Sequence, residues 1–459
     1  MKTFVLDTNV LLQSPTALSS FGANIVVIPE AVLEELDSFK KDTGELGYCA
    51  RAAIRTIEGL RATGNLIGAG VPMDNGGILR VEMNHYVEEI PPNWDRTKAD
   101  NRILQVCAAL KQRGEQVYLI TKDVLERVKA EMLGLTAEDF ENEMAPLPSE
   151  QYRGRRVVYA GRDAIDTLYA NEQGVPVQGL GLVGEAGETV TDLCENEFLV
   201  VRSAHGSSQS ALAFHRGGQV VPLRYAKKQP YGVSARNAGQ LFFQEALLAP
   251  VAEAPLVIAK GSAGTAKTFL SLAAGLEKVD LRGRERREFR RILVCRPNTS
   301  MDEDLGYLPG TEQEKIDPLM RPVYDNLEVL VDSDDKGRYE DERELADKVR
   351  ELFDRGLIIT QAVGFLRGRS IARHWLIVDE AQNLTPKQVK GIITRAGEGT
   401  KIILIGDPDQ IDHPYLDSRT NGLCYASDRM RGSRLCWQVT FEPDECVRSP
   451  LAAEGAERL

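Results

Sequence analysis

The stretch Leu256-Val-Ile-Ala-Lys-Gly-Ser-Ala-Gly-Thr-Ala-Lys-Thr268 decides the fold of the second half of the chain. Its apolar start predicts a buried strand, its small residues predict a tight loop, and the residues after Lys267 favour a helix. Gly261 and Gly264 would let backbone N–H groups converge on phosphate oxygens, next to the positive end of the helix dipole. Lys267 would reach the outer phosphates, and Thr268 would hold Mg²⁺ through its hydroxyl. We therefore predict a nucleotide-binding loop that consists of Gly261, Ser262, Ala263, Gly264, Thr265, Ala266, Lys267 and Thr268.

One residue of this loop departs from the usual pattern. The pattern G-x-x-x-x-G-K-[ST] has glycine at the position that Ala266 occupies here. The added methyl group would restrict the loop or loosen nucleotide binding. The alternative interpretation is an ordinary strand, turn and helix with an accidental likeness to the motif.

Two later strand ends favour the nucleotide site. Residues 375–378 predict a second buried strand that ends at Asp379 and Glu380. Asp379 would hold Mg²⁺ through water, while Glu380 would orient and deprotonate the attacking water. Residues 401–405 predict a third strand, and Gln410 beyond its end would sense the γ-phosphate.

Two polar positions lie at predicted helix starts. Gln240 comes just before the helix predicted over residues 241–248, where its amide would read the edge of adenine. A polar first turn of that helix is an equally good interpretation. Thr385 and Gln388, with Pro386 between them, form a capping box, so we interpret them as structural.

The phosphate loop, the Asp-Glu strand end and the Gly-Asp-x-x-Gln strand end, in this order, resemble superfamily-one helicases. Three other stretches resemble the PhoH-like ATPases, namely residues 305–327, 364–369 and 447–449. That resemblance implies ATP hydrolysis coupled to RNA unwinding in a hexameric ring. It also implies that Arg448 is an arginine finger that enters a neighbouring subunit's site. Arg367 and Arg369 would grip RNA phosphates or the nucleotide, with a surface turn as the alternative.

The first segment of the chain alternates predicted strands with predicted helices. This order indicates a mostly parallel sheet, whose ligands bind beyond the carboxyl ends of the strands. Four acids lie near such ends, namely Asp7, Glu35, Asp100 and Asp123. Gathered carboxylates raise one another's pKa, and Mg²⁺ or Mn²⁺ relieves their repulsion and makes hydroxide from bound water. The alternative is that the aspartates cap helices and that Glu35 lies on a solvated helix face.

This segment resembles the PIN nuclease domain in residues 5–12, 35–36, 98–104 and 121–123. The resemblance implies a metal-dependent ribonuclease, although some such domains are catalytically silent. Its catalytic metal ligands would be Asp7, Glu35, Asp100 and Asp123. Together the two resemblances match bacterial PIN–PhoH fusion proteins, which implies RNA as the substrate and leaves open a small antitoxin-like protein as a partner.

A chain of 459 residues is too long for one ordinary core, so two or three domains are expected. We predict an α/β protein with a PIN-like nuclease domain over residues 1–145. A β-rich linker module follows over residues 146–228, and a PhoH-like P-loop ATPase domain occupies residues 229–459. The middle module has no pattern that indicates a function.

Composition limits the remaining choices. A net charge of −12 argues against adhesion to nucleic acid by bulk charge, so any nucleic-acid path would be local. The seven cysteines form no Cys-x-x-Cys pair, which fits a reducing cytosol better than a disulfide framework. The chain begins directly with a strand-like segment, and no apolar run approaches the length of a membrane span. We therefore expect a cytoplasmic protein that does not contact the membrane.

Two other functions stay open from the sequence. The first is a nucleotide-switched RNA-binding scaffold that neither unwinds nor cuts, which Ala266 would favour by impairing turnover. The second is an equivalent enzyme that acts on DNA, because no pattern in the chain reads a 2′-hydroxyl group.

Overall fold

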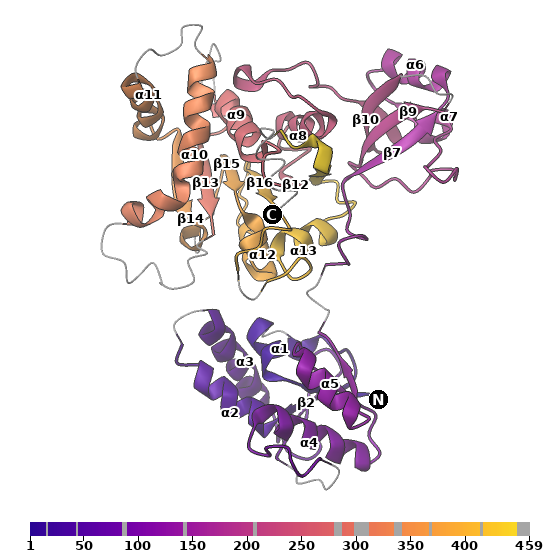
Figure 1. Ribbon diagram of the computed structural model, residues 1–459, viewed down its shortest axis with the longest axis vertical. Coiled ribbons are helices and arrows are strands. Elements are labelled where there is room, and N and C mark those ends of the chain that lie inside the picture. The colour runs from indigo at the N-terminus through magenta and orange to yellow at the C-terminus, as the bar shows by residue number, and fades with distance from the viewer. Residues whose placement is uncertain are drawn as a thin grey trace. The chain divides into compact units, whose positions relative to one another are not determined.

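The computed structural model describes residues 1–14, 17–42, 45–84, 90–140, 145–204, 209–279, 287–297, 312–334, 342–366, 370–413 and 416–447. The chain folds into two compact units, Met1–Glu143 and Met144–Leu459. Each unit contains a mostly parallel sheet flanked by helices (Figure 1), so the predicted α/β class is confirmed. Among the helices of the described ranges, none is both long and apolar enough to cross a membrane.

The N-terminal unit contains a six-stranded sheet in the order β3-β4-β2-β1-β5-β6. All of its strand pairs are parallel except β3 with β4. Val5 in β1 pairs with Val27 on one side and Leu119 on the other, and all three are fully buried, as expected for a sheet covered on both faces. The strands are β1 (Thr3–Leu6), β2 (Ile25–Pro29), β3 (Val71–Pro72), β4 (Ile78–Glu82), β5 (Val117–Ile120) and β6 (Thr136–Glu138).

The helices of this unit begin where the sequence supplies caps. Asp7 caps the first helix by accepting a hydrogen bond from Thr8 N, and Asp123 caps the last by accepting one from Leu125 N. Pro29 immediately precedes α2, where its missing N–H costs nothing. The helices are α1 (Thr8–Gln13), η1 (Ala17–Ser19), α2 (Glu30–Phe39), α3 (Glu45–Arg61), α4 (Ala99–Gln112) and α5 (Val124–Met132).

The second unit contains an all-parallel, six-stranded sheet in the order β14-β13-β15-β16-β12-β17. The strands that the sequence analysis singled out, β15, β16 and β12, are neighbours in this sheet, so their carboxyl ends lie next to one another. The strands are β12 (Leu256–Lys260), β13 (Arg291–Arg296), β14 (Ile358–Ala362), β15 (His374–Val378), β16 (Lys401–Gly406) and β17 (Cys436–Thr440).

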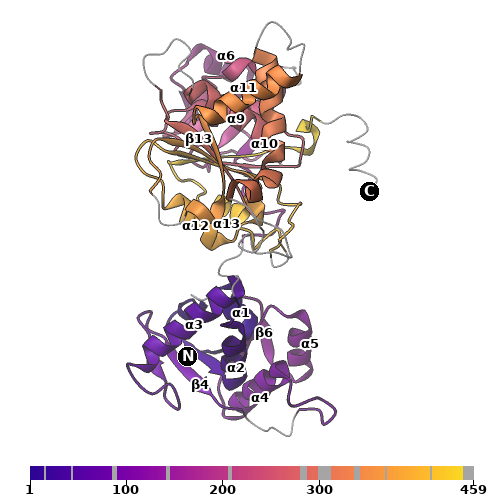
Figure 2. The same cartoon turned by 90° about the vertical axis from the view of Figure 1, so that its left-hand side faces the viewer.

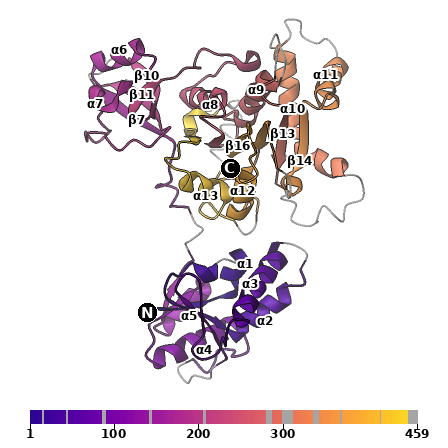
Figure 3. The same cartoon turned by 180° about the vertical axis from the view of Figure 1, so that it is seen from behind.

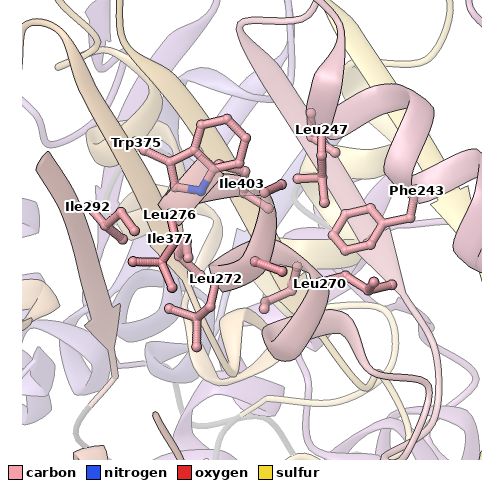
Figure 4. Close-up of a cluster of buried hydrophobic side chains, with 14 of the residues drawn as sticks. Phe243, Leu247, Leu270, Leu272, Leu276, Ile292, Trp375, Ile377 and Ile403 are labelled. Atoms are coloured by element: carbon pink, nitrogen blue, oxygen red, sulfur yellow. The ribbon is translucent and has the colours of Figure 1, made fainter. Parts of the chain in front are cut away.

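Alternate residues of these strands pack on opposite faces of the sheet. Ile377 and Ile403 belong to the core beneath α8, α9 and α10, which also contains Trp375 (Figure 4). Leu376 and Leu404 belong to the core on the other face, beneath α12 and α13. Figure 2 shows α9, α10 and α11 on one side of the sheet and α12 and α13 on the other. The helices are α8 (Ala238–Leu248), α9 (Lys267–Val279), α10 (Glu312–Asp334), α11 (Glu342–Asp354), α12 (Pro386–Ile393) and α13 (Gly422–Arg429), with short 3-10 turns η2 (Pro230–Gly232), η3 (Val363–Leu366), η4 (Ala381–Asn383) and η5 (Pro443–Glu445).

A smaller five-stranded sheet, in the order β7-β9-β10-β11-β8, lies beside the parallel one in the second unit (Figure 3). As predicted, this segment is rich in strands. Only β7 with β9 is a parallel pair among its named strands. Its elements are β7 (Arg155–Ala160), α6 (Arg162–Ala170), β8 (Val175–Pro176), α7 (Val177–Leu180), β9 (Phe198–Ser203), β10 (Ser210–Arg216) and β11 (Gln219–Pro222). We call it the middle module.

The middle module packs directly against the parallel sheet. Phe198 of β9 stacks on Phe242 of α8 with ring centroids 4.7 Å apart, and it meets Trp437 of β17 edge-on at 5.6 Å. Asn196 Nδ2 donates a hydrogen bond of 3.2 Å to the carbonyl oxygen of Cys436. The module and the parallel sheet therefore share one core, which explains why they form a single compact unit.

Candidate nucleotide and metal sites

The predicted phosphate loop connects β12 to α9, and α9 begins at Lys267. Gly264 and Ala266 both take left-handed backbone conformations, with φ of +87° and +66°. A side chain at Gly261 would collide with Phe441, because a Cβ placed there would lie 2.8 Å from the Phe441 Cβ. The loop thus has glycine at two positions that need it and alanine at a third where glycine would be less strained.

Lys267 lies inside this loop. Its Nζ donates hydrogen bonds to the carbonyl oxygens of Gly261, at 2.6 Å, and Ser262, at 2.9 Å. A third hydrogen bond, 3.1 Å long, joins it to Thr265 Oγ1. The side chain is buried, and this burial lowers the pKa of the ammonium group. The ammonium group of Lys267 is therefore bound by carbonyl oxygens of the loop, and the phosphates of a nucleotide would compete with these oxygens for it.

Two acids from neighbouring strands border the loop. Asp379 follows β15, and its Oδ1 accepts a hydrogen bond of 3.2 Å from Thr268 Oγ1. Asp407 follows β16, and its Oδ2 accepts one of 3.1 Å from Ala263 N. Burial raises the pKa of both carboxyl groups. The fold therefore brings the three strand ends together, with a hydroxyl and a carboxylate in contact that suit a hydrated Mg²⁺.

Sequence reasoning missed Arg296, the last residue of β13. Its Nη2 donates to Glu380 Oε1 at 2.8 Å, and its Nε lies 3.2 Å from Asp379 Oδ2. Its Nη1 donates to the carbonyl oxygen of Leu319 in α10 at 2.7 Å. An arginine after the apolar run Ile292-Leu-Val-Cys295 and just before Pro297 was the available signal. Its partners became evident only from the neighbouring position of β15 in the sheet.

A second missed residue, Gln382, links several predicted site residues. Its Nε2 donates to Glu380 Oε2 at 2.7 Å and to the carbonyl oxygen of Gln410 at 2.8 Å. Its Oε1 accepts a hydrogen bond of 3.1 Å from Asp407 N. Gln382 is fully buried, whereas Gln410 is exposed. The network connects Glu380, the predicted base, to Gln410, the predicted γ-phosphate sensor.

Gln240 lies in the first turn of α8, buried against the phosphate loop. Its Oε1 accepts a hydrogen bond of 2.8 Å from Arg236 N, and its Nε2 donates to the carbonyl oxygen of Thr265 at 3.4 Å. Its amide therefore joins the start of α8 to the loop. A place in the first turn of α8 beside the phosphate loop is compatible with both interpretations from the sequence, adenine recognition and a polar helix turn.

The last described residues of the chain also contact the loop. Val447 N donates to the carbonyl oxygen of Gly264 at 3.0 Å, and Cys446 Sγ donates to that of Ala263 at 3.1 Å. Arg448, the predicted arginine finger, follows directly in the sequence but lies outside the described residues. Arg367, Arg369 and residues 305–311 also lie outside them.

In the N-terminal unit, Asp7 is buried at the end of β1. Its Oδ2 accepts a hydrogen bond of 2.7 Å from Thr121 Oγ1, and its Oδ1 accepts one of 2.5 Å from Thr8 N. The hydroxyl of Thr8 donates a short hydrogen bond to Glu35 Oε2. Burial raises the pKa of both Asp7 and Glu35, and the negative charge of Asp100 raises both further. Three of the four predicted acids, from β1, α2 and α4, therefore act on one another.

Asp123, the fourth predicted acid, is exposed and caps α5, with its Oδ1 2.7 Å from Leu125 N. That is the alternative role raised from the sequence. Glu126, one turn further along the helix, is 1% exposed and was missed. Burial, followed by the negative charge of Asp7, raises the pKa of Glu126 to about 10. An acid three residues after Asp123 was a visible signal, but an exposed helix face explained it equally well.

The oxygen donors of this cluster fit Mg²⁺ or Mn²⁺, because buried carboxyl groups with raised pKa values are those that a divalent cation would stabilise. Within the described ranges, no three Asp, Glu, His or Cys side chains already stand close enough to hold a metal ion together. A cation would therefore draw these carboxylates inward. Asp7 would be the central ligand, because its negative charge raises the pKa of both Glu35 and Glu126 more than the charge of Asp100 does.

Comparison with known proteins identifies the two domains that carry these sites. The family model described as "PIN domain" matches residues 4–141, and the one described as "PhoH-like protein" matches residues 232–457. The chain is 39% identical to Protein PhoH2 of Bacillus subtilis over the whole of both chains. The chain belongs to the PhoH2 family.

Two other PhoH2 proteins are similar over all of this chain. The one from Thermobispora bispora is 33% identical and is covered over 96% of its length. The one from Mycolicibacterium smegmatis is 32% identical and is covered over 97% of its length. The resemblance to PIN–PhoH fusion proteins is thereby confirmed, with a PIN nuclease domain at the N-terminus and a PhoH-like ATPase domain at the C-terminus.

Proposed function

We propose that this PhoH2 protein is an ATP-dependent RNA helicase coupled to a metal-dependent endoribonuclease. The observation that carries the proposal is the presence of two separate charged sites in one chain. One is a loop with an enclosed lysine and a threonine–aspartate contact, and the other is a buried cluster of carboxylates. The first suits triphosphate hydrolysis, and the second suits phosphodiester hydrolysis.

At the ATPase site, the residues of the loop from Gly261 to Thr268 would bind the phosphates of ATP, and Lys267 would stabilise the charge on the outer ones. Thr268 and Asp379, already in contact, would hold Mg²⁺, which neutralises charge on the phosphates when bound. Glu380 would accept a proton from the attacking water. Gln382 supports this arrangement because its side chain is hydrogen-bonded to both Glu380 and Gln410. A shift of Gln410 on loss of the γ-phosphate would therefore change the hydrogen bonding of Glu380.

At the PIN site, Asp7, Glu35 and Asp100 would hold Mg²⁺ or Mn²⁺, which supplies a hydroxide nucleophile when bound. Asp123, at the open end of β5, would orient an outer ligand or the substrate backbone. The fold supports this site because Asp7 and Asp123 lie beyond the carboxyl ends of β1 and β5 and Asp100 lies in the first turn of α4, near the sheet edge where parallel sheets bind ligands.

The assembly would be a hexameric ring that threads RNA toward the PIN domains in the cytoplasm. Arg448 would act as an arginine finger; it directly follows Val447, which is hydrogen-bonded to the phosphate loop of its own chain. In a ring, this terminal segment could reach a neighbouring subunit. A small antitoxin-like protein would be a further partner of the PIN domain.

The test uses tailed RNA duplexes and unstructured RNA with ATP and Mn²⁺. Lys267→Ala should abolish ATP hydrolysis and unwinding while leaving cleavage of unstructured RNA. Asp7→Asn should do the reverse, since asparagine keeps the helix cap and removes the charge. Lys278→Ala in α9 and the exposed Asp74→Asn serve as controls and should change neither activity. Cleavage that persists in purified Asp7→Asn protein would refute the nuclease assignment.

A second candidate is a nucleotide-switched RNA-binding scaffold, and the left-handed Ala266 favours it. A strained loop whose lysine is bound to its own carbonyl oxygens would bind nucleotide and turn it over slowly. Steady-state phosphate release at a rate typical of enzymes would eliminate this candidate. A tailed DNA duplex in the same assay distinguishes an enzyme that acts on DNA, which would unwind or cut it as well as RNA.

A further inference from the structure

We propose that Glu126 is a metal ligand of the PIN site, supplied by α5 in addition to the acids recognised from the sequence. This inference rests on the proposed nuclease function and deepens it. It names a residue that would bind the cation together with Asp7.

The position of Glu126 follows from the way α5 begins. Asp123 is the cap residue and faces solvent, so the helix proper starts at Val124. Glu126 is in the first turn and points to the interior, with 1% of its surface exposed. Its carboxyl group lies beside Asp7 and Thr121, at the carboxyl ends of β1 and β5. These two strands are parallel neighbours in the sheet.

Both oxygens of the Glu126 carboxyl group are buried, and no N–H group donates a hydrogen bond to either of them within the described structure. Its acidic neighbour is Asp7, with which it can only share a proton. Thr121 has a single hydroxyl hydrogen, which it donates to Asp7 Oδ2 at 2.7 Å. A buried carboxyl group whose partner is a second acid is destabilising, and an apolar side chain would fill the same space at lower cost. A purely structural role therefore does not account for glutamate here.

The surrounding charges indicate what the missing partner is. The negative charges of Asp7 and Asp100 both act on Glu126. Another anion is excluded by this repulsion, and a divalent cation is the ligand that would satisfy several such oxygens at once. With Glu126 included, the acids around Asp7 come from α2, α4 and α5, so they approach the cation from several sides.

The experiment measures Mn²⁺ binding directly, without RNA, nucleotide or activity. Free Mn²⁺ is quantified by electron paramagnetic resonance during titration of the full-length chain. Glu126→Gln and Glu126→Leu should each weaken the PIN-site affinity on the order of tenfold or more, the loss typical of disturbing a metal site. Glu131→Gln, which makes the same change at an exposed position of α5, should bind like the wild type. Any Mn²⁺ held elsewhere in the chain is common to all variants.

A measurement of thermal unfolding separates lost ligation from lost folding. Glu126→Leu should unfold at the same temperature as the metal-free wild type or higher, yet gain less stability from added Mn²⁺. If Glu126→Leu does not fold, Glu126→Gln carries the test because it keeps the shape of the side chain. Unchanged Mn²⁺ affinity in the folded Glu126 variants overturns the inference.

Asp7→Asn distinguishes failure of this inference from failure of the proposed function. If Asp7→Asn loses Mn²⁺ binding and the Glu126 variants keep it, Glu126 alone is wrongly assigned. If Asp7→Asn also binds Mn²⁺ normally, then the metal site itself is refuted.

Discussion

Arg296 Nη2 lies 2.8 Å from Glu380 Oε1 and donates a hydrogen bond to it. Arg296 ends β13 and Glu380 lies just beyond the end of the adjacent strand β15, although 84 positions separate the two residues in the sequence. The same guanidinium approaches Asp379 and binds the carbonyl oxygen of Leu319 in α10. One partly buried cation therefore balances both acids of the proposed ATPase site and connects them to the helix that packs beside it.

Arg296→Gln should lower the kcat of ATP hydrolysis. Without the guanidinium, Glu380 loses the hydrogen bond that orients its carboxylate toward the attacking water. A decrease of about tenfold to a hundredfold is expected, near the lower end of what a positioned base contributes. The KM for ATP should change little, because Arg296 contacts the acids rather than the phosphate loop. Steady-state phosphate release measures both values, and Arg290→Gln, exposed before the same strand, is the control. An unchanged kcat would contradict the orienting role.

Ala266→Gly should tighten ATP binding and modestly stabilise the ATPase unit. Alanine in a left-handed conformation destabilises the folded state by about 1–2 kcal/mol, which glycine would relieve. Glycine also makes the unfolded chain more flexible, and this offsets about half of the stability gained. Isothermal titration with ATP and a denaturation midpoint measure the two effects. Ala263→Gly provides the matched control in the same loop, because Ala263 is not among the described residues with positive φ. That variant should be less stable than the wild type. If both variants were equally less stable than the wild type, Ala266 would not be strained.

Arg155→Met should destabilise the second unit strongly. Arg155 Nη1 binds Glu445 Oε2 at 2.6 Å, and both side chains are 8% exposed. Removing one partner of a buried pair typically costs about 3–5 kcal/mol, because the other charge stays buried. Glu445 also accepts a hydrogen bond from Gly239 N at the start of α8, so the loss would extend to the region of the phosphate loop.

The neighbouring pair Arg153–Glu442 gives a matched comparison for that variant. Its arginine is 53% exposed, so Arg153→Ala should cost less than about 1 kcal/mol. Urea denaturation followed by tryptophan fluorescence reports on this unit, which contains the buried Trp375 and Trp437. Similar midpoints for the two variants would mean that the Arg155 pair does not hold the middle module in place.

Lys401→Met should weaken the dependence of stability on pH. Complete burial lowers the pKa of Lys401, and its Nζ donates to the carbonyl oxygens of Ala246, at 2.7 Å, and Ala249, at 2.8 Å. A neutral amine has two hydrogens, which match these two acceptors. The unfolded chain binds more protons between the native and unfolded pKa values, so this lysine makes stability rise with pH in that interval.

The measurement for Lys401 compares denaturation midpoints at about pH 8 and about pH 10, where the unfolded lysine loses its proton. The rise in midpoint should be smaller for Lys401→Met than for the wild type. Lys390→Met, at an exposed position in α12, should keep the wild-type dependence. Parallel pH profiles for all three proteins would show that Lys401 is charged in the native state.

The sequence by itself determined the local elements and the motifs within them. The loop from Gly261 to Thr268 joins a strand to a helix as predicted, and the capping box of Thr385 and Gln388 is present with both hydrogen bonds. Asp7 stands at the end of its strand. These features depend on residues within a few positions of one another, because backbone conformation and helix capping are decided by near neighbours.

Only the tertiary structure decided which charges meet. Nothing near Arg296 in the sequence identifies Glu380 as its partner, and nothing near Glu126 indicates that its carboxyl group is buried beside Asp7. The role of Asp123 as an exposed cap and the shared core of the middle module were also decided by packing. The physical reason is that burial and electrostatic pairing depend on strand order and helix packing, which bring distant segments together.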